Sequence, residues 1–206
     1  MNLERNRKEL IILMTLATLG LGFTAIDPYD RATWVLEVAP VIIGVILLAL
    51  TFGRFPLTPL VYRLLFLHAL ILIVGGYYTY ARVPPGFWIQ ELLNFERNHY
   101  DRLGHFVQGA VPALLLREIL LRCSPLQAGA WTFVLVTSMC LAFSALYELI
   151  EWWVAVFAGG GAVAFLGTQG DPWDAQWDMF MALIGAVLAQ VLFSRLHNRA
   201  LARLVG

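Results

Sequence analysis

The sequence predicts an all-α protein, a polytopic transmembrane helical bundle of about six spans. Hydrophobic residues make up 60% of the 206-residue chain and charged residues 14%, against about 45–50% and about 25% in soluble domains. Apolar stretches of about 20 residues, enough to cross a hydrocarbon core about 30 Å thick, recur along the chain. The alternating pattern that a transmembrane barrel requires is missing. We therefore expect residues 1–206 to form a single integral membrane domain in contact with the lipid bilayer.

The expected spans follow one another with turn signals between them. They cover residues 10–26, 35–53, 60–80, 103–121, 127–157 and 177–196. Glycine and proline groups separate them, at Pro28, Pro56, Pro84–Gly86, Pro125 and Gly159–Gly161. The first apolar stretch follows a basic segment, as in a secretory signal, but no small-residue cleavage site comes after it, so we expect an uncleaved helix.

Residues 87–98, between the third and fourth spans, predict a short helix in the membrane interface. Trp88, Leu92 and Phe95 recur at helical spacing, and Glu91 and Arg97 belong to the opposite face. An ordinary loop outside the membrane is the alternative.

The distribution of charge predicts that both termini are cytoplasmic. Six spans put the termini on one side. That side carries ten of the 14 basic residues: Arg5, Arg7, Lys8, Arg54, Arg63, Arg117, Arg122, Arg195, Arg199 and Arg203. Lys and Arg are enriched in cytoplasmic loops. The acids gather on the opposite side: Asp27, Asp30, Glu37, Glu91, Glu96, Asp101, Glu148, Glu151, Asp171, Asp174 and Asp178.

Pairs of ionisable residues stand at the outer ends of the last three spans. Asp101 and His105 are four residues apart, as are Asp174 and Asp178, so each pair shares one helical face. Glu148 lies near the outer end of the fifth span. We predict that these side chains meet in one pocket. The candidate catalytic residues are Asp101, His105, Glu148 and Asp178, and the candidate metal ligands are the same four with Asp174.

Buried carboxylates need protons, cationic partners or a bound cation to offset their desolvation. A carboxylate-rich site with one histidine suits a divalent cation such as magnesium, manganese or zinc. Each residue also has a structural interpretation. Asp171 before Pro172 suits a helix N-cap, and Asp101 could cap the fourth span. Glu151 beside Trp152 favours a solvated helix end.

The other polar residues are less informative. We expect His68 to make a helix–helix contact and His99 and His197 to be exposed to solvent. Cys123 and Cys140 have no ligand or disulfide spacing and are read as packing residues. No basic cluster indicates nucleic acid binding.

Three segments resemble the YjdF-like bacterial inner-membrane proteins. They are Tyr100–Phe106, Ser144–Trp152 and Gly167–Met179. The resemblance covers nearly the whole chain and implies a multi-pass protein of the bacterial inner membrane, with no assigned catalytic residues. A weaker likeness is to the VanZ-like membrane proteins, carried by Asp101, His105–Phe106, Glu148 and Asp178 with Gly185. It implies a role in the cell envelope.

Three functions remain open from the sequence. The first is an outward-facing site, metal- or proton-dependent, that acts on a lipid or lipid-linked envelope substrate. The second is a structural or interaction protein whose polar cluster only fixes helix packing. The third is a small transporter, which the nearly apolar inner halves of the spans disfavour.

Overall fold

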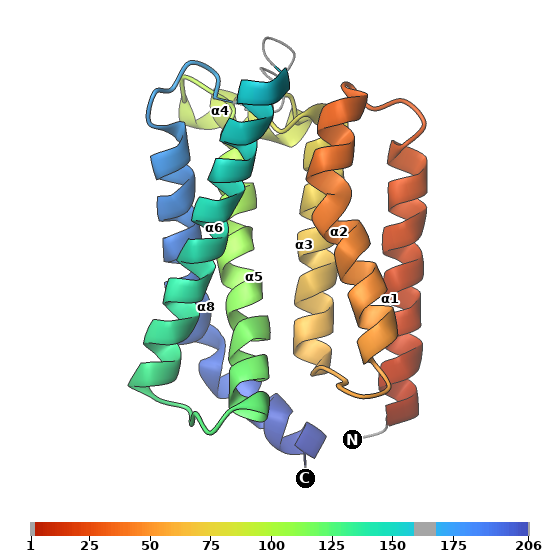
Figure 1. Cartoon of the computed structure of the whole chain (residues 1–206). Coiled ribbons are helices and arrows are strands. Elements are labelled where there is room, and N and C mark those ends of the chain that lie inside the picture. Colours follow the sequence, from red (N-terminus) through yellow and green to blue (C-terminus); the bar gives the residue numbers. More distant parts are fainter. Residues whose placement is uncertain (1–2, 159–167, 206) are drawn as a thin grey trace.

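The computed structural model describes residues 3–158 and 168–205, and these residues form seven α-helices and no strand. The helices are α1 (Leu3–Thr24), α2 (Arg31–Thr51), α3 (Pro59–Tyr78), α4 (Pro84–Leu93), α5 (Tyr100–Cys123), α6 (Ala130–Ala158) and α8 (Asp174–Val205). Six long helices run along one axis, with α1, α2 and α3 on one side and α5, α6 and α8 on the other (Figure 1). The prediction of an all-α helical bundle is confirmed.

Four helices are long and apolar enough to cross a membrane by length and composition: α2, α3, α6 and α8. The helices α1 and α5 lie beside them in the bundle and have similar lengths, 22 and 24 residues. Each predicted span corresponds to one of these six helices. The start of α1 and the end of α8 lie at the same end of the bundle (Figure 1). The opposite end, where α4 lies, is called the α4 end below.

Most helix boundaries differ from the prediction by a few residues, and the start of α1 by seven. Helix α8 ends at Val205, nine residues beyond the predicted span, because the polar segment after Leu196 continues the helix outside the apolar stretch. The short helix starts at Pro84, since a proline fits the first helical turn, where its missing N–H is not needed. It ends before Asn94, whose φ of 55° is left-handed. The predicted turn at 159–161 lies outside the described residues.

Close packing of α5 on α8 depends on two glycines. A Cβ on Gly109 would lie 1.9 Å from the carbonyl oxygen of Ala182, and one on Gly185 would lie 2.0 Å from that of Phe106. Small residues allow transmembrane helices to approach this closely. The contact brings the polar first turns of α5 and α8 together at the α4 end.

The other half of the bundle packs more loosely. Helices α1 and α2 both pack on α3, and α3 contacts α5. An apolar cavity of about 480 Å³ lies among these four helices, and His68 on α3 is one of its few polar lining residues. Cys140 is buried in the core, as predicted, whereas Cys123 is exposed, so its expected packing role is wrong.

Candidate functional site: a histidine among carboxylates

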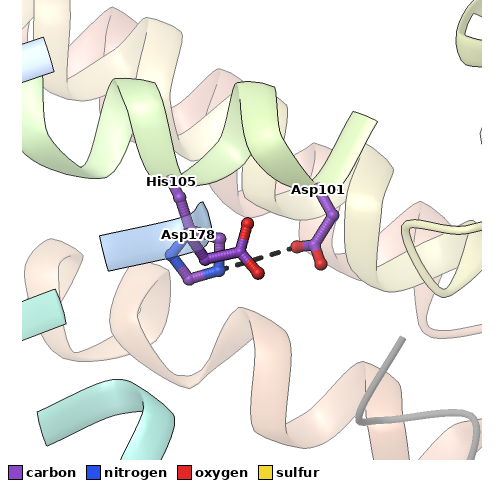
Figure 2. Close-up of side chains that lie close together, drawn as sticks. All are labelled: Asp101, His105 and Asp178. Atoms are coloured by element: carbon purple, nitrogen blue, oxygen red, sulfur yellow. Dashed lines mark ion pairs between the residues drawn. The ribbon is translucent and has the colours of Figure 1, made fainter. Parts of the chain in front are cut away.

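His105 lies among carboxylates contributed by three helices at the α4 end. Its Nε2 is 3.7 Å from an Asp101 oxygen on the preceding turn of α5. Its Nδ1 is 3.7 Å from an oxygen of Glu148 on α6. Figure 2 shows Asp178 of α8 beside the same ring, across from Asp101. The four side chains therefore lie together at this end of the bundle, as the sequence predicts.

Two groups of side chains have the spacing of metal ligands. The first is Asp101, His105 and Asp178, and the second is His105, Glu148 and Glu151. Within each group the candidate ligand atoms lie within 4.8 Å of one another. His105 belongs to both groups, since its two ring nitrogens face different carboxylates. Glu151 was expected to reach into water, but it is half-buried and belongs to the second group.

Several buried polar atoms in this cluster have no hydrogen-bond partner among the residues that the structure describes. They are His105 Nδ1, Ser144 Oγ, Glu148 Oε1 and Asp178 Oδ1. The 3.7 Å separations are too long for hydrogen bonds. They are short enough for two ligands of one ion, because two atoms each about 2.1 Å from a shared ion lie at most about 4.2 Å apart. Each of the two pairs therefore has the spacing of two ligands of a divalent cation, one pair at each nitrogen of the ring.

The two arginines nearest the cluster are already paired. Arg97 contacts Asp174 at 2.7 Å, and Arg102 contacts Asp171 at 2.7 Å. Among the described residues, no lysine or arginine forms an ion pair with Asp101, Glu148 or Asp178. The carboxylates around His105 thus lack the cationic partners that usually offset burial.

Asp171 and Asp174 contact arginines and the backbone near the start of α8 rather than the ring of His105. Asp171 was predicted to cap the helix at Pro172, but α8 begins three residues after Asp171, at Asp174. Asp171 Oδ1 instead accepts the N–H of Trp173, which makes a local turn. Asp174 was a candidate ligand, and neither group of metal-spaced residues includes it.

The capping role considered for Asp101 is taken by another residue. Helix α5 begins at Tyr100, whose backbone N–H is bound by the side chain of Asn98 at 3.0 Å. The neighbouring His99 lies between α4 and α5, where burial and the charges of Arg102 and Arg97 lower its pKa. Asp101 does not cap the helix, and its carboxylate points to His105 instead.

Glu37 on α2 is a buried acid near the cluster that the sequence prediction omitted from the site. It accepts a hydrogen bond from the hydroxyl of Tyr147, on α6, at 3.0 Å. It also interacts electrostatically with Asp101. An acid inside an otherwise apolar span was a visible signal, but its position on a distant helix gave no reason to group it with His105.

A second polar network lies at the other end of the bundle. Glu118 on α5 binds Thr58, Arg122 on its own helix and His197 of α8. Glu118 and His197 are both fully buried. The expectation that His197 is exposed is therefore wrong, because the helix continues past the predicted span and turns this ring onto α5.

Comparison with known proteins agrees with the fold. The family described as "Predicted membrane protein (DUF2238)" matches residues 9–199. The chain is 53% identical over 203 residues to "Inner membrane protein YjdF" of Escherichia coli (strain K12), which covers 98% of this chain and 97% of that protein. No solved structure matches. The chain is accordingly a multi-pass protein of the bacterial inner membrane.

Proposed function

The chain belongs to the DUF2238 family of predicted membrane proteins, and from this membership and the geometry at the α4 end we propose that it is a metal-dependent membrane enzyme. The cation would be held by His105 with Asp101 and Asp178, or with Glu148 and Glu151. The observation that carries the proposal is the position of the His105 ring, with each nitrogen 3.7 Å from a different carboxylate. Manganese and zinc suit a site of one imidazole and several carboxylates better than calcium does.

We place this site at the periplasmic face. The proposal takes all six long helices as membrane spans and both ends of the chain as cytoplasmic. Arg63 is near the start of α3, and Arg117, Arg122 and Arg195 are in the second halves of α5 and α8, the parts of these helices away from α4. An excess of basic residues is typical of the cytoplasmic side. The exposed Trp88 and Trp173 support an interface at the α4 end, where indole rings are enriched.

The substrate class we propose is a lipid or a lipid-linked envelope molecule. The apolar cavity of about 480 Å³ supports this class, because it offers space for a hydrocarbon tail inside the bundle. Most of the residues that line the cavity lie in the half of the bundle away from α4, and His68, near the middle of α3, is among those nearest the α4 end. A tail in the cavity would extend from there toward the α4 end, so that its polar head meets the carboxylates. A bound cation there could polarise an ester oxygen or activate water.

The metal content of the purified protein tests the proposal. Protein in lipid nanodiscs, loaded with manganese or zinc and then desalted, is expected to retain about one ion per chain by mass spectrometry of the elements. His105→Ala should reduce this retention strongly, because both groups of candidate ligands use this ring. Asp178→Asn should reduce it where the group of Asp101, His105 and Asp178 holds the ion. Glu91→Gln is the matched control, since it removes an exposed acid at the same end of the bundle. Equal retention by all four proteins would rule the site out.

The alternative function is structural. The hydrogen bond from Tyr147 to Glu37 favours it, because a polar contact between α6 and α2 can hold the two halves of the bundle together without any chemistry. In that case the ligand variants would lower stability in detergent, and no metal would be retained by the wild-type protein.

A further inference from the structure

Arg117 on α5 is a buried guanidinium that forms no ion pair with any described residue. Its side chain contacts Nδ1 of His197 at 3.0 Å and Oδ1 of Asn198 at 2.6 Å. Only 5% of Arg117 is exposed. Both partners are uncharged acceptors: a His197 nitrogen that accepts from arginine carries no proton, so its other nitrogen donates to Glu118. Nothing described here neutralises the positive charge of Arg117.

The nearest acid is used by other groups. One oxygen of Glu118 accepts from Arg122 at 2.7 Å, and the other accepts from the hydroxyl of Thr58 at 2.7 Å and from His197 at 3.1 Å. Glu118 and Arg122 therefore balance each other. The network as a whole retains one excess positive charge, and that charge is on Arg117.

A polar cavity of about 330 Å³ adjoins this arginine. Its wall is made by Arg117, by Gln190, Ser194 and Asn198 of α8, by residues 128 and 129 before α6, and by Ala130 and Phe133 of α6. An arginine has five N–H donors, of which two are used here, so donors remain for a ligand in the cavity.

The start of α6 adds to the positive potential of the cavity. Ala130, the first residue of α6, is part of the wall, and the first N–H groups of a helix have no partner within it. The positive end of the helix dipole favours an anion at this position. An uncompensated buried arginine, a polar cavity and a helix N-terminus thus converge on one volume.

We propose that this cavity binds a phosphate group, at the end of the bundle opposite the His105 cluster. Arg117 would contact the phosphate oxygens, with Ser194 and the first turn of α6 completing the shell. Arginine suits phosphate because its planar fork of donors matches two oxygens at once. The phosphate could belong to a soluble ion or to the headgroup of a lipid, since the cavity lies near the end of the helices.

Two binding measurements on the full-length protein distinguish these sources. Titration of the detergent-purified protein with inorganic phosphate, followed by calorimetry, measures the affinity for the soluble ion. Native mass spectrometry after incubation with dioleoylphosphatidylglycerol measures how much of this lipid the protein retains. Dioleoylglycerol is the control, because it has the same tails without phosphate. Saturable binding in either arm supports the site and identifies the source. Absence of saturable phosphate binding together with equal retention of the two lipids would overturn it.

Two variants test the location. Arg117→Gln should weaken phosphate or phospholipid binding at least about tenfold, because it removes the charge. Ser194→Leu should have a similar effect by filling the cavity without touching the contacts of Arg117, so it decides the question if Arg117→Gln does not fold. Arg199→Gln, an exposed position on α8, is the matched control and should bind as the wild type does. Wild-type binding by a folded Arg117→Gln or by Ser194→Leu would refute the assignment.

Discussion

The hydroxyl of Tyr147 on α6 donates a hydrogen bond of 3.0 Å to Glu37 on α2. The helices α2 and α6 belong to opposite halves of the bundle, which meet mainly through α3 and α5. This bond is thus a polar link between the two halves, in addition to the packing of α3 on α5.

Loss of this link should destabilise the bundle. Tyr147→Phe removes this hydrogen bond to the buried Glu37, and we expect the free energy of unfolding in detergent to fall by about 1–3 kcal/mol. Thermal unfolding followed by size-exclusion chromatography measures the change. Tyr78→Phe is the control, and a Tyr147→Phe protein as stable as the wild type would contradict the structural role of the bond.

The glycine contact between α5 and α8 gives a second prediction. Gly109→Ala places a methyl group against the Ala182 carbonyl oxygen, so the helices must separate, at a cost of about 1–3 kcal/mol. Gly44→Ala in α2 meets nothing within 4 Å and should be neutral or stabilising by up to about 1 kcal/mol, because alanine favours the helix. The same thermal assay compares them. Equal stability of the two variants would mean that the close approach is not required.

The polar network around Glu118, at the end of the bundle opposite α4, gives a third prediction. Glu118→Leu leaves Arg122 near the bundle core without its carboxylate partner, and we expect a loss of about 3–5 kcal/mol. The double variant Glu118→Leu with Arg122→Met should recover part of that loss, because Arg122, the charge that Glu118 paired, is removed as well. Unfolding in increasing concentrations of a harsh detergent ranks the three proteins. A double variant less stable than Glu118→Leu alone would show that the unpaired charge of Arg122 is not the main cause of the lost stability.

The proposed topology gives a fourth prediction. In a background without Cys123 and Cys140, a cysteine placed at the exposed Glu96 should react with a membrane-impermeant maleimide added to cells whose outer membrane has been permeabilised. A cysteine at the exposed Arg203 should react only after the inner membrane is opened. The reverse labelling pattern would indicate the opposite orientation in the membrane, with the His105 cluster at the cytoplasmic side.

Local patterns were sufficient to predict much of the fold and part of the site. Six apolar stretches correspond to the six long helices, because hydrophobic length is a local property. The pairing of Asp101 with His105 followed from the four-residue spacing alone. Convergence of Glu148 and Asp178 on the same ring was also predicted, because the outer ends of the last three spans all carry acids.

Contacts between distant segments escaped the sequence prediction. Nothing near Asp174 indicates that Arg97 would pair with it. His197 follows the last apolar stretch and therefore resembles a solvent-exposed residue, yet its burial depends on Arg117 and Glu118, about 80 residues earlier in the chain. The Gly109 contact is visible only once α5 and α8 are placed side by side.

The polar ends of α5 have a consequence for the order in which the protein is made. This helix is not among the four that could cross a membrane by length and composition. The buried residues His105 and Arg117 both face α8, which the ribosome synthesises after α5. We therefore expect α5 to be stable in the bilayer only once α8 has emerged, so that truncation of the chain before residue 174 should reduce the membrane insertion of α5.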